Sequence, residues 1–362
     1  MRHAAVFALV LFLLLPISAS VFAFSPELDL IDLEALEAAQ PEEAQNVYGF
    51  LRPDDVPDVH ALLLKLWGYL TGQSGGLFSS ALQSGAEILA AAFLTALCCA
   101  VSESKLLPLI GSTVTAMACI QSISSCASVG KRALESLTDY SRVLLPCLST
   151  AAAAGGAWSS AGAKYAASML FIDFMTTLEQ NALSPLLYLY AATAITAHLT
   201  EHPLLLSISG LMKQAMKWCL IIITMCFTFY LNITGILSGT VDAAAAKAAK
   251  TVISSALPVV GKILADASGA FLSGVQMLRN GIGIIGMLVV LAVCVVPYVS
   301  LGSHYLVFQI SAGVSCSMGD KRLGGVIRCI GDVYGFLLGM VGSVSMMLLV
   351  SIVALMKAVG VE

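Results

Sequence analysis

Three stretches in the C-terminal half of the chain carry no charged residue: Trp218 to Val241, Asn280 to Gly319 and Val333 to Met356. A helix that crosses the hydrocarbon core of a bilayer needs about 20 mostly apolar residues, and the first and last stretches are slightly longer than that. The pattern therefore predicts a membrane span in each of these two. The middle stretch is longer and is interrupted by Pro297 and Gly302, so it fits one span with a shorter return helix, or a hairpin.

The apolar runs nearer the N-terminus are rich in Ala, Ser and Gly. Helices of this composition pack closely against other helices, so we interpret the runs as partly buried spans. They are Ala81 to Val101, Leu106 to Val129, Val143 to Ala163 and Ala182 to Leu199. Between the last two, Tyr165 to Gln180 could lie flat at the membrane interface.

Isolated acids lie within or near these runs at Glu87, Asp173 and Glu179. Ionisable residues inside a membrane commonly line a pathway, so these three are possible intramembrane acids. The alternative is that they lie at the interfaces.

A different pattern covers Ala243 to Asn280, where apolar residues recur at helical spacing along one side. Pro258 should kink this region, and it is followed by Gly261, Lys262 and Asp266. Lys262 and Asp266 are one turn apart and could neutralise each other. We predict a membrane-parallel or re-entrant helix pair, with these four residues as possible conduit or amphipathic-helix residues.

Composition agrees with a membrane protein. Only 11% of the 362 residues are charged and 58% are hydrophobic, whereas soluble domains are about 25% charged. The fold class predicted is all-α: a polytopic integral membrane helical bundle with about six to eight spans plus amphipathic or re-entrant helices. Neither half of the chain has the basic patch of a nucleic-acid-binding protein.

The N-terminus predicts three segments. Residues 1–23 have the basic start, short apolar core and small-residue end of a secretory signal peptide, with an uncleaved anchor as the alternative. Residues 24–76 form an acidic extracytoplasmic segment that becomes interfacial near Trp67 and ends in a Gly72 to Gly76 turn. Residues 77–362 form the helical transmembrane domain.

Basic clusters bear on orientation. The positive-inside rule favours cytoplasmic placement of Lys213/Lys217, of Lys321/Arg322/Arg328 and of Lys131/Arg132/Arg142. Lys247, Lys250 and Lys262 lie on the other side of the Trp218 span, so charge alone leaves the topology open.

Small residues recur every four positions at Gly331, Gly335, Gly339 and Ser343. Such a ridge lets helices approach closely and predicts a helix-packing surface, either within the chain or with a partner subunit.

One catalytic pattern occurs, because His198-Leu199-Thr200-Glu201-His202 has the H-x-x-E-H order of inverted zincins. Pro203 follows at once and frays the helix that both imidazoles would need. A third ligand is also required, for which Asp242 or Asp266 could be nominated. We favour a polar cap at a span end and expect no catalytic residue, metal or cofactor.

The layout resembles a known family. A signal sequence, an acidic exported segment, an Ala/Ser-rich middle and the block Ser255 to Lys262 with Ala265 to Ala267 are similar to stage III sporulation protein AE of endospore-forming Firmicutes. The Pro258 to Asp266 part is the most specific.

The resemblance implies a non-enzymatic, multi-pass subunit in the mother-cell membrane around the forespore, acting as a permease-like or export-platform component required for sporulation. Implied partners are other stage III sporulation membrane subunits, a cytoplasmic ATPase and an exported ring-forming subunit, within a lipid bilayer. The alternatives are a stand-alone secondary transporter or a membrane metallopeptidase that uses His198, Glu201 and His202.

Overall fold

The computed structural model describes residues 33–48, 59–101, 107–154, 158–256, 260–317 and 321–356. Every element in these ranges is helical, which confirms the all-α prediction. The elements are α2 (Leu33–Ala38), α3 (Glu42–Tyr48), α4 (Val59–Val101), α5 (Leu107–Ala152), α6 (Trp158–Leu178), the π-helical turn η3 (Glu179–Leu183), α7 (Ser184–Thr200), α8 (Pro203–Ala256), α9 (Val260–Ser317) and α10 (Lys321–Met356).

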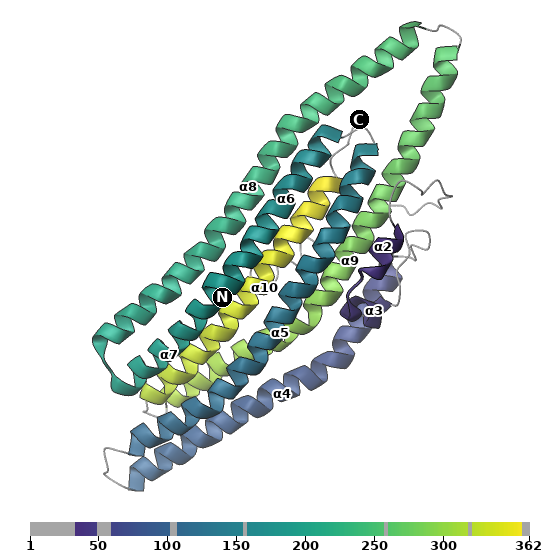
Figure 1. Ribbon diagram of the computed structural model, residues 1–362. Helices are drawn as coiled ribbons and strands as arrows, with labels where there is room; N and C mark the ends of the chain where they lie inside the picture. The colour runs from purple at the N-terminus through teal and green to yellow at the C-terminus, as the bar shows by residue number, and fades with distance from the viewer. Residues whose placement is uncertain are drawn as a thin grey trace.

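The long helices run side by side, with α10 at the centre (Figure 1). α10 packs against α5, α6, α7, α8 and α9, whereas α4 packs on α5 and α9. The core side chains of α10 include Val333, Tyr334, Val344 and Leu348, which are almost fully buried. The last helix of the chain therefore holds the bundle together.

Five segments are long and apolar enough to cross a membrane: Gly75–Thr95, Ala161–Thr200, Pro203–Leu231, Arg279–Ser317 and Arg322–Met356. They lie in α4, in α6 with α7, in α8, in α9 and in α10. The protein is therefore a multi-pass membrane protein.

The predicted return helix in the middle charge-free stretch is wrong, because α9 continues from Val260 to Ser317 through Pro297. Proline removes one backbone hydrogen bond, but packing on α5 and α10 holds both halves in one helix. α9 buries apolar side chains against α4, α5 and α10, and this packing favours one continuous helix over a reversal of the chain.

The predicted membrane-parallel course of residues 243–280 is also wrong, and the re-entrant alternative stays a prediction. The second half of α8 and the start of α9 continue those two helices as one long hairpin, which projects beyond the ends of α6 and α10 (Figure 1). At 1.5 Å per residue, the 54-residue α8 is about 80 Å long, far more than the hydrocarbon core. Gly261, Lys262 and Asp266 lie in the first turns of α9, and Pro258 lies outside the described residues.

Three further predictions of local structure are wrong, because helices continue where the sequence suggested an interruption. Gly72 to Gly76 lies within α4 and forms no turn. Tyr165 to Gln180 belongs to a candidate span and does not lie flat. The two predicted spans on either side of residues 130–142 are parts of one helix, α5.

A π-helical turn joins α6 to α7. The Ser184 N–H bonds the Glu179 carbonyl, five residues back. Pro185, which follows, has no N–H to donate and its ring crowds the carbonyl four residues earlier, so the wider turn accommodates it. This local irregularity fixes the position of Glu179.

Candidate functional site

One face of α5 is polar from Ser124 to Arg142. Its exposed residues are Ser124, Ser125, Ser128, Lys131, Arg132, Glu135, Asp139 and Arg142, which we call the polar stripe. The opposite face is buried and largely apolar, with Leu137, Leu144 and Leu148 fully enclosed. Because the charges occupy only one face, the sequence supports a single amphipathic helix instead of two spans and a loop.

The polar stripe lies at the depth of the apolar spans. Beside it, a Cβ at Gly130 would meet Leu337 and Val341 in the middle of α10. Further along, Thr138 bonds Thr176 of α6, with 3.1 Å between the hydroxyl oxygens. Both partners belong to candidate spans. The cytoplasmic placement of Lys131, Arg132 and Arg142 stays a prediction, whereas the position of the stripe beside α6 and α10 is defined by these contacts.

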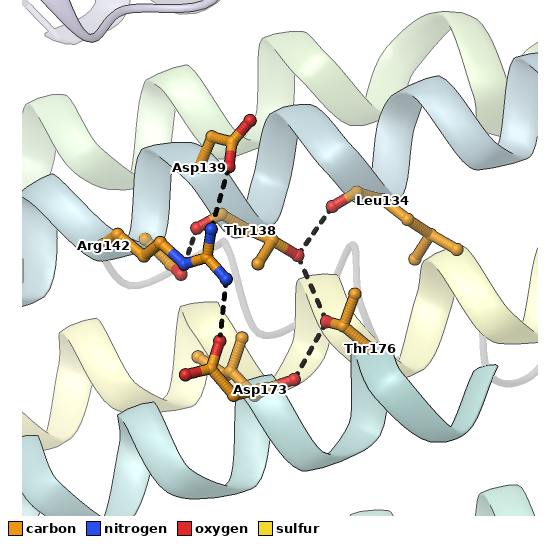
Figure 2. Close-up of polar contacts among 8 residues, drawn as sticks. Leu134, Thr138, Asp139, Arg142, Asp173 and Thr176 are labelled. Atoms are coloured by element: carbon orange, nitrogen blue, oxygen red, sulfur yellow. Dashed lines mark hydrogen bonds and ion pairs between the residues drawn. The ribbon is translucent and has the colours of Figure 1, made fainter. Parts of the chain in front are cut away.

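A polar pocket of about 280 Å³ opens between the stripe and α6. Arg142 points between two carboxylates, and its guanidinium lies 3.4 Å from Asp139 Oδ1 and 3.4 Å from Asp173 Oδ1 (Figure 2). Lys131 pairs with Glu135 at 3.7 Å. The pocket is lined by Glu135, Thr138, Asp139, Arg142, Asp173, Thr176, Thr177 and Gln180.

The outward face of α8 is apolar instead. α8 exposes Leu211, Trp218, Met225 and Phe229, each by more than half. Such faces suit lipid, whereas a charged side chain in the hydrocarbon core is costly and normally faces water or protein. The polar stripe therefore differs in character from the apolar outward face of α8.

A second polar cluster, which the sequence analysis missed, lies inside the bundle around Asp332 of α10. Its carboxylate forms an ion pair with Lys213 of α8. It also accepts hydrogen bonds from Tyr190 of α7 at 3.2 Å and Gln309 of α9 at 3.4 Å. One carboxylate thus joins four helices. In the sequence, Asp332 directly precedes the charge-free stretch Val333 to Met356, so it resembles an ordinary polar residue at the end of a span. Only its pairing with Lys213 in another span indicates that it lies inside the bundle.

The three acids predicted from the sequence lie in different settings. Glu87 is exposed on α4 and accepts a hydrogen bond from Gln83. Asp173 lies in the polar pocket. Glu179 is fully buried, and its Oε1 lies 2.7 Å from Ser343 Oγ of α10.

The small-residue ridge of α10 faces other helices of the same chain. A Cβ at Gly331 would lie 3.2 Å from Gln309 of α9, and one at Gly335 would lie 3.1 Å from the Tyr305 ring. Gly339 faces Leu220 of α8, and Ser343 faces Glu179. The structure thus places the ridge against α9, α8 and η3.

The H-x-x-E-H residues are not arranged around a metal. Glu201 ends α7 with a left-handed φ of 53°, so His202 lies beyond the helix. His198 packs against Gly325 of α10, and Glu201 binds Arg322. Within the described part of the chain, no group of three or more His, Cys, Asp and Glu side chains is placed to hold a metal. The metallopeptidase alternative is not favoured.

Glu201 and Arg322 tie the α7 end to the α10 start. The guanidinium donates two hydrogen bonds, from Nε at 2.7 Å and Nη2 at 2.9 Å. This hydrogen bonding holds the pKa of Glu201 below its ordinary value. The stabilisation is therefore complete above the ordinary pKa of a glutamate and is lost as pH falls through the lower folded value.

We expect an NMR titration of isotopically labelled glutamate to give Glu201 a midpoint below the ordinary value of a glutamate side chain. Arg322→Gln should raise the Glu201 midpoint toward that ordinary value, because it removes the hydrogen bonds that stabilise the carboxylate. An unchanged Glu201 midpoint in the variant would mean that the ion pair does not form in solution.

Comparison with known proteins identifies the family of this chain. The profile of the family described as stage III sporulation protein AE matches residues 88–359. The chain belongs to this family. It is similar to stage III sporulation protein AE of Bacillus subtilis (strain 168), with 23% identity over 198 residues, which cover 55% of this chain and 49% of that protein. The match thus spans about half the length of that relative. No solved structure matches.

Membership of the stage III sporulation protein AE family makes the chain a sporulation-related membrane protein. The matched region begins inside α4 and includes all of α5 to α10, so the polar stripe and the Asp332 cluster both lie within it.

Proposed function

We propose that this protein is a non-enzymatic, permease-like subunit of a membrane channel or secretion complex that connects the mother cell with the forespore. The observation that carries the proposal is the polar stripe on α5, which lies level with the apolar spans. Charges at that depth are stable beside water or a polar protein partner, but not beside lipid. In our proposal the stripe lines the aqueous passage.

A single stripe does not enclose a passage. The polar stripe and Asp173 face outward from the bundle, so the opposite wall comes from other subunits of the complex. This requirement supports membership of a complex over a stand-alone secondary transporter, whose binding site lies between halves of one chain. We propose that the partners are other stage III sporulation proteins, including an ATPase and a ring-forming exported subunit, in the mother-cell membrane.

Cysteine labelling in intact sporulating cells tests the passage. We expect Glu135→Cys to react with a charged, water-soluble thiol reagent, because the stripe contacts water. The matched control is Phe229→Cys on the apolar face of α8, which lipid should protect. Peptide mass spectrometry identifies the labelled position despite the native cysteines.

Equal protection of both positions would contradict the aqueous passage. Affinity purification of the full-length protein from the same cells tests the complex separately. Recovery of the protein without any other sporulation membrane subunit would contradict the complex, even if Glu135→Cys were labelled.

A further inference from the structure

Glu179 lies in the interior of the bundle with no exposed surface. It begins the π-helical turn between α6 and α7, and its side chain contacts α10 at Ser343. π-Turns inside helices often occur at functional sites. The Glu179 side chain is thus held at a joint between three helices.

The hydrogen bonds around Ser343 indicate where the protons lie. Ser343 Oγ is 2.7 Å from Glu179 Oε1 and 2.7 Å from the Met340 carbonyl oxygen. A serine hydroxyl has one hydrogen to donate. If Glu179 were ionised, two acceptors would compete for that hydrogen. If Glu179 carries a proton, its O–H donates to Ser343 Oγ, and the Ser343 O–H donates to Met340, so both contacts are hydrogen bonds.

The charges around Glu179 agree with this assignment. Its second oxygen, Oε2, has no hydrogen-bond partner, and Glu179 forms no ion pair with the other residues that the structure describes. The titratable neighbour on α8 is Cys219, a thiol and not a cation. A buried carboxylate without a positive partner costs several kcal/mol, whereas a neutral carboxyl group leaves only one unsatisfied carbonyl oxygen.

We propose that Glu179 is a proton-binding site inside the bundle, where the bound proton completes the chain of hydrogen bonds from Glu179 through Ser343 to Met340. This chain ties the α6–α7 joint to α10. Release of the proton would leave a negative charge between these helices, so proton binding and helix packing are coupled at this position. The proposal does not depend on the passage proposed above.

Infrared spectroscopy of the full-length protein in lipid at neutral pH tests the site. We expect a C=O stretching band of a protonated carboxyl group that shifts in deuterium oxide and disappears in Glu179→Gln. The matched control is Glu87→Gln, which replaces an exposed glutamate on α4 and should keep the band. Loss of ionised-carboxylate intensity in Glu179→Gln, with no change in the C=O band, would overturn the proposal.

A second variant keeps the test decisive if Glu179→Gln does not fold. Ser343→Ala removes the acceptor of the Glu179 proton, so the C=O band of the remaining carboxyl group should move to higher frequency. A wild-type spectrum with no protonated-carboxyl band, or a band that Ser343→Ala leaves in place, would also overturn it.

Discussion

Replacing Lys213 with methionine should destabilise the protein by about 2 kcal/mol, because it leaves the Asp332 carboxylate inside the bundle without a counter-charge. The Asp332 side chain is 16% exposed, whereas that of Lys213 is 45% exposed. The expected loss is therefore below the roughly 3–5 kcal/mol typical of a fully buried pair. Reversible unfolding in detergent measures it.

The opposite single change should cost less. Asp332→Asn keeps a side-chain oxygen, which can still accept a hydrogen bond from Tyr190 or Gln309. The unpaired Lys213 costs little because its side chain is 45% exposed and can extend its ammonium group toward a polar environment. The double variant, Lys213→Met with Asp332→Asn, contains no unpaired charge. We expect it to recover most of the loss seen with Lys213→Met. A double variant whose loss equals the sum of the two single losses would show that the pair contributes nothing.

Replacing Gly324 with leucine should destabilise the α9–α10 hairpin by about 3 kcal/mol, at the upper end of the usual cost of overpacking. A Cβ at Gly324 would contact Cys316 of α9 and would lie 3.1 Å from the Ala312 carbonyl oxygen. Backbone atoms cannot rotate away as a side chain can, so the two helices would have to separate. Thermal unfolding of the purified protein in detergent measures the loss.

Gly313→Leu is the matched control for Gly324→Leu. Gly313 is exposed on α9, and a Cβ there would meet nothing within 4 Å. Because leucine is a better helix former than glycine, this change should stabilise the helix slightly, by up to about 1 kcal/mol. Equal unfolding temperatures for the two variants would contradict the close approach of α9 and α10 at Gly324.

The sequence correctly predicted helices in the three charge-free stretches. The charge-free stretches beginning at Trp218, Asn280 and Val333 lie in α8, α9 and α10, since membrane length and composition determine such spans locally. The sequence did not predict α5 correctly. Lys131 to Arg142 divides its apolar positions into two runs, and the prediction did not use the spacing that places these charges on one face of a continuous helix, whose other face packs on α9 and α10.

The candidate site was predicted in part. Asp173 and Glu179 were identified because they are isolated acids among apolar residues, but their partners lie in other helices: Arg142 in the preceding α5 and Ser343 in the distant α10. Asp332 was missed because its role depends on Lys213, which is brought to it by the α8–α10 contact. Local patterns indicate which residues are costly in a membrane, whereas tertiary packing decides what neutralises them.

The two-faced character of α5 has a consequence for biosynthesis. α5 leaves the ribosome well before α9 and α10, the helices that bury its apolar face. At roughly 5–20 residues per second, the delay is on the order of ten seconds. During that time a helix with Lys131, Arg132 and Arg142 on one side is unsuited to release into lipid. We therefore expect α5 to reach its final position only after α9 and α10 have been made.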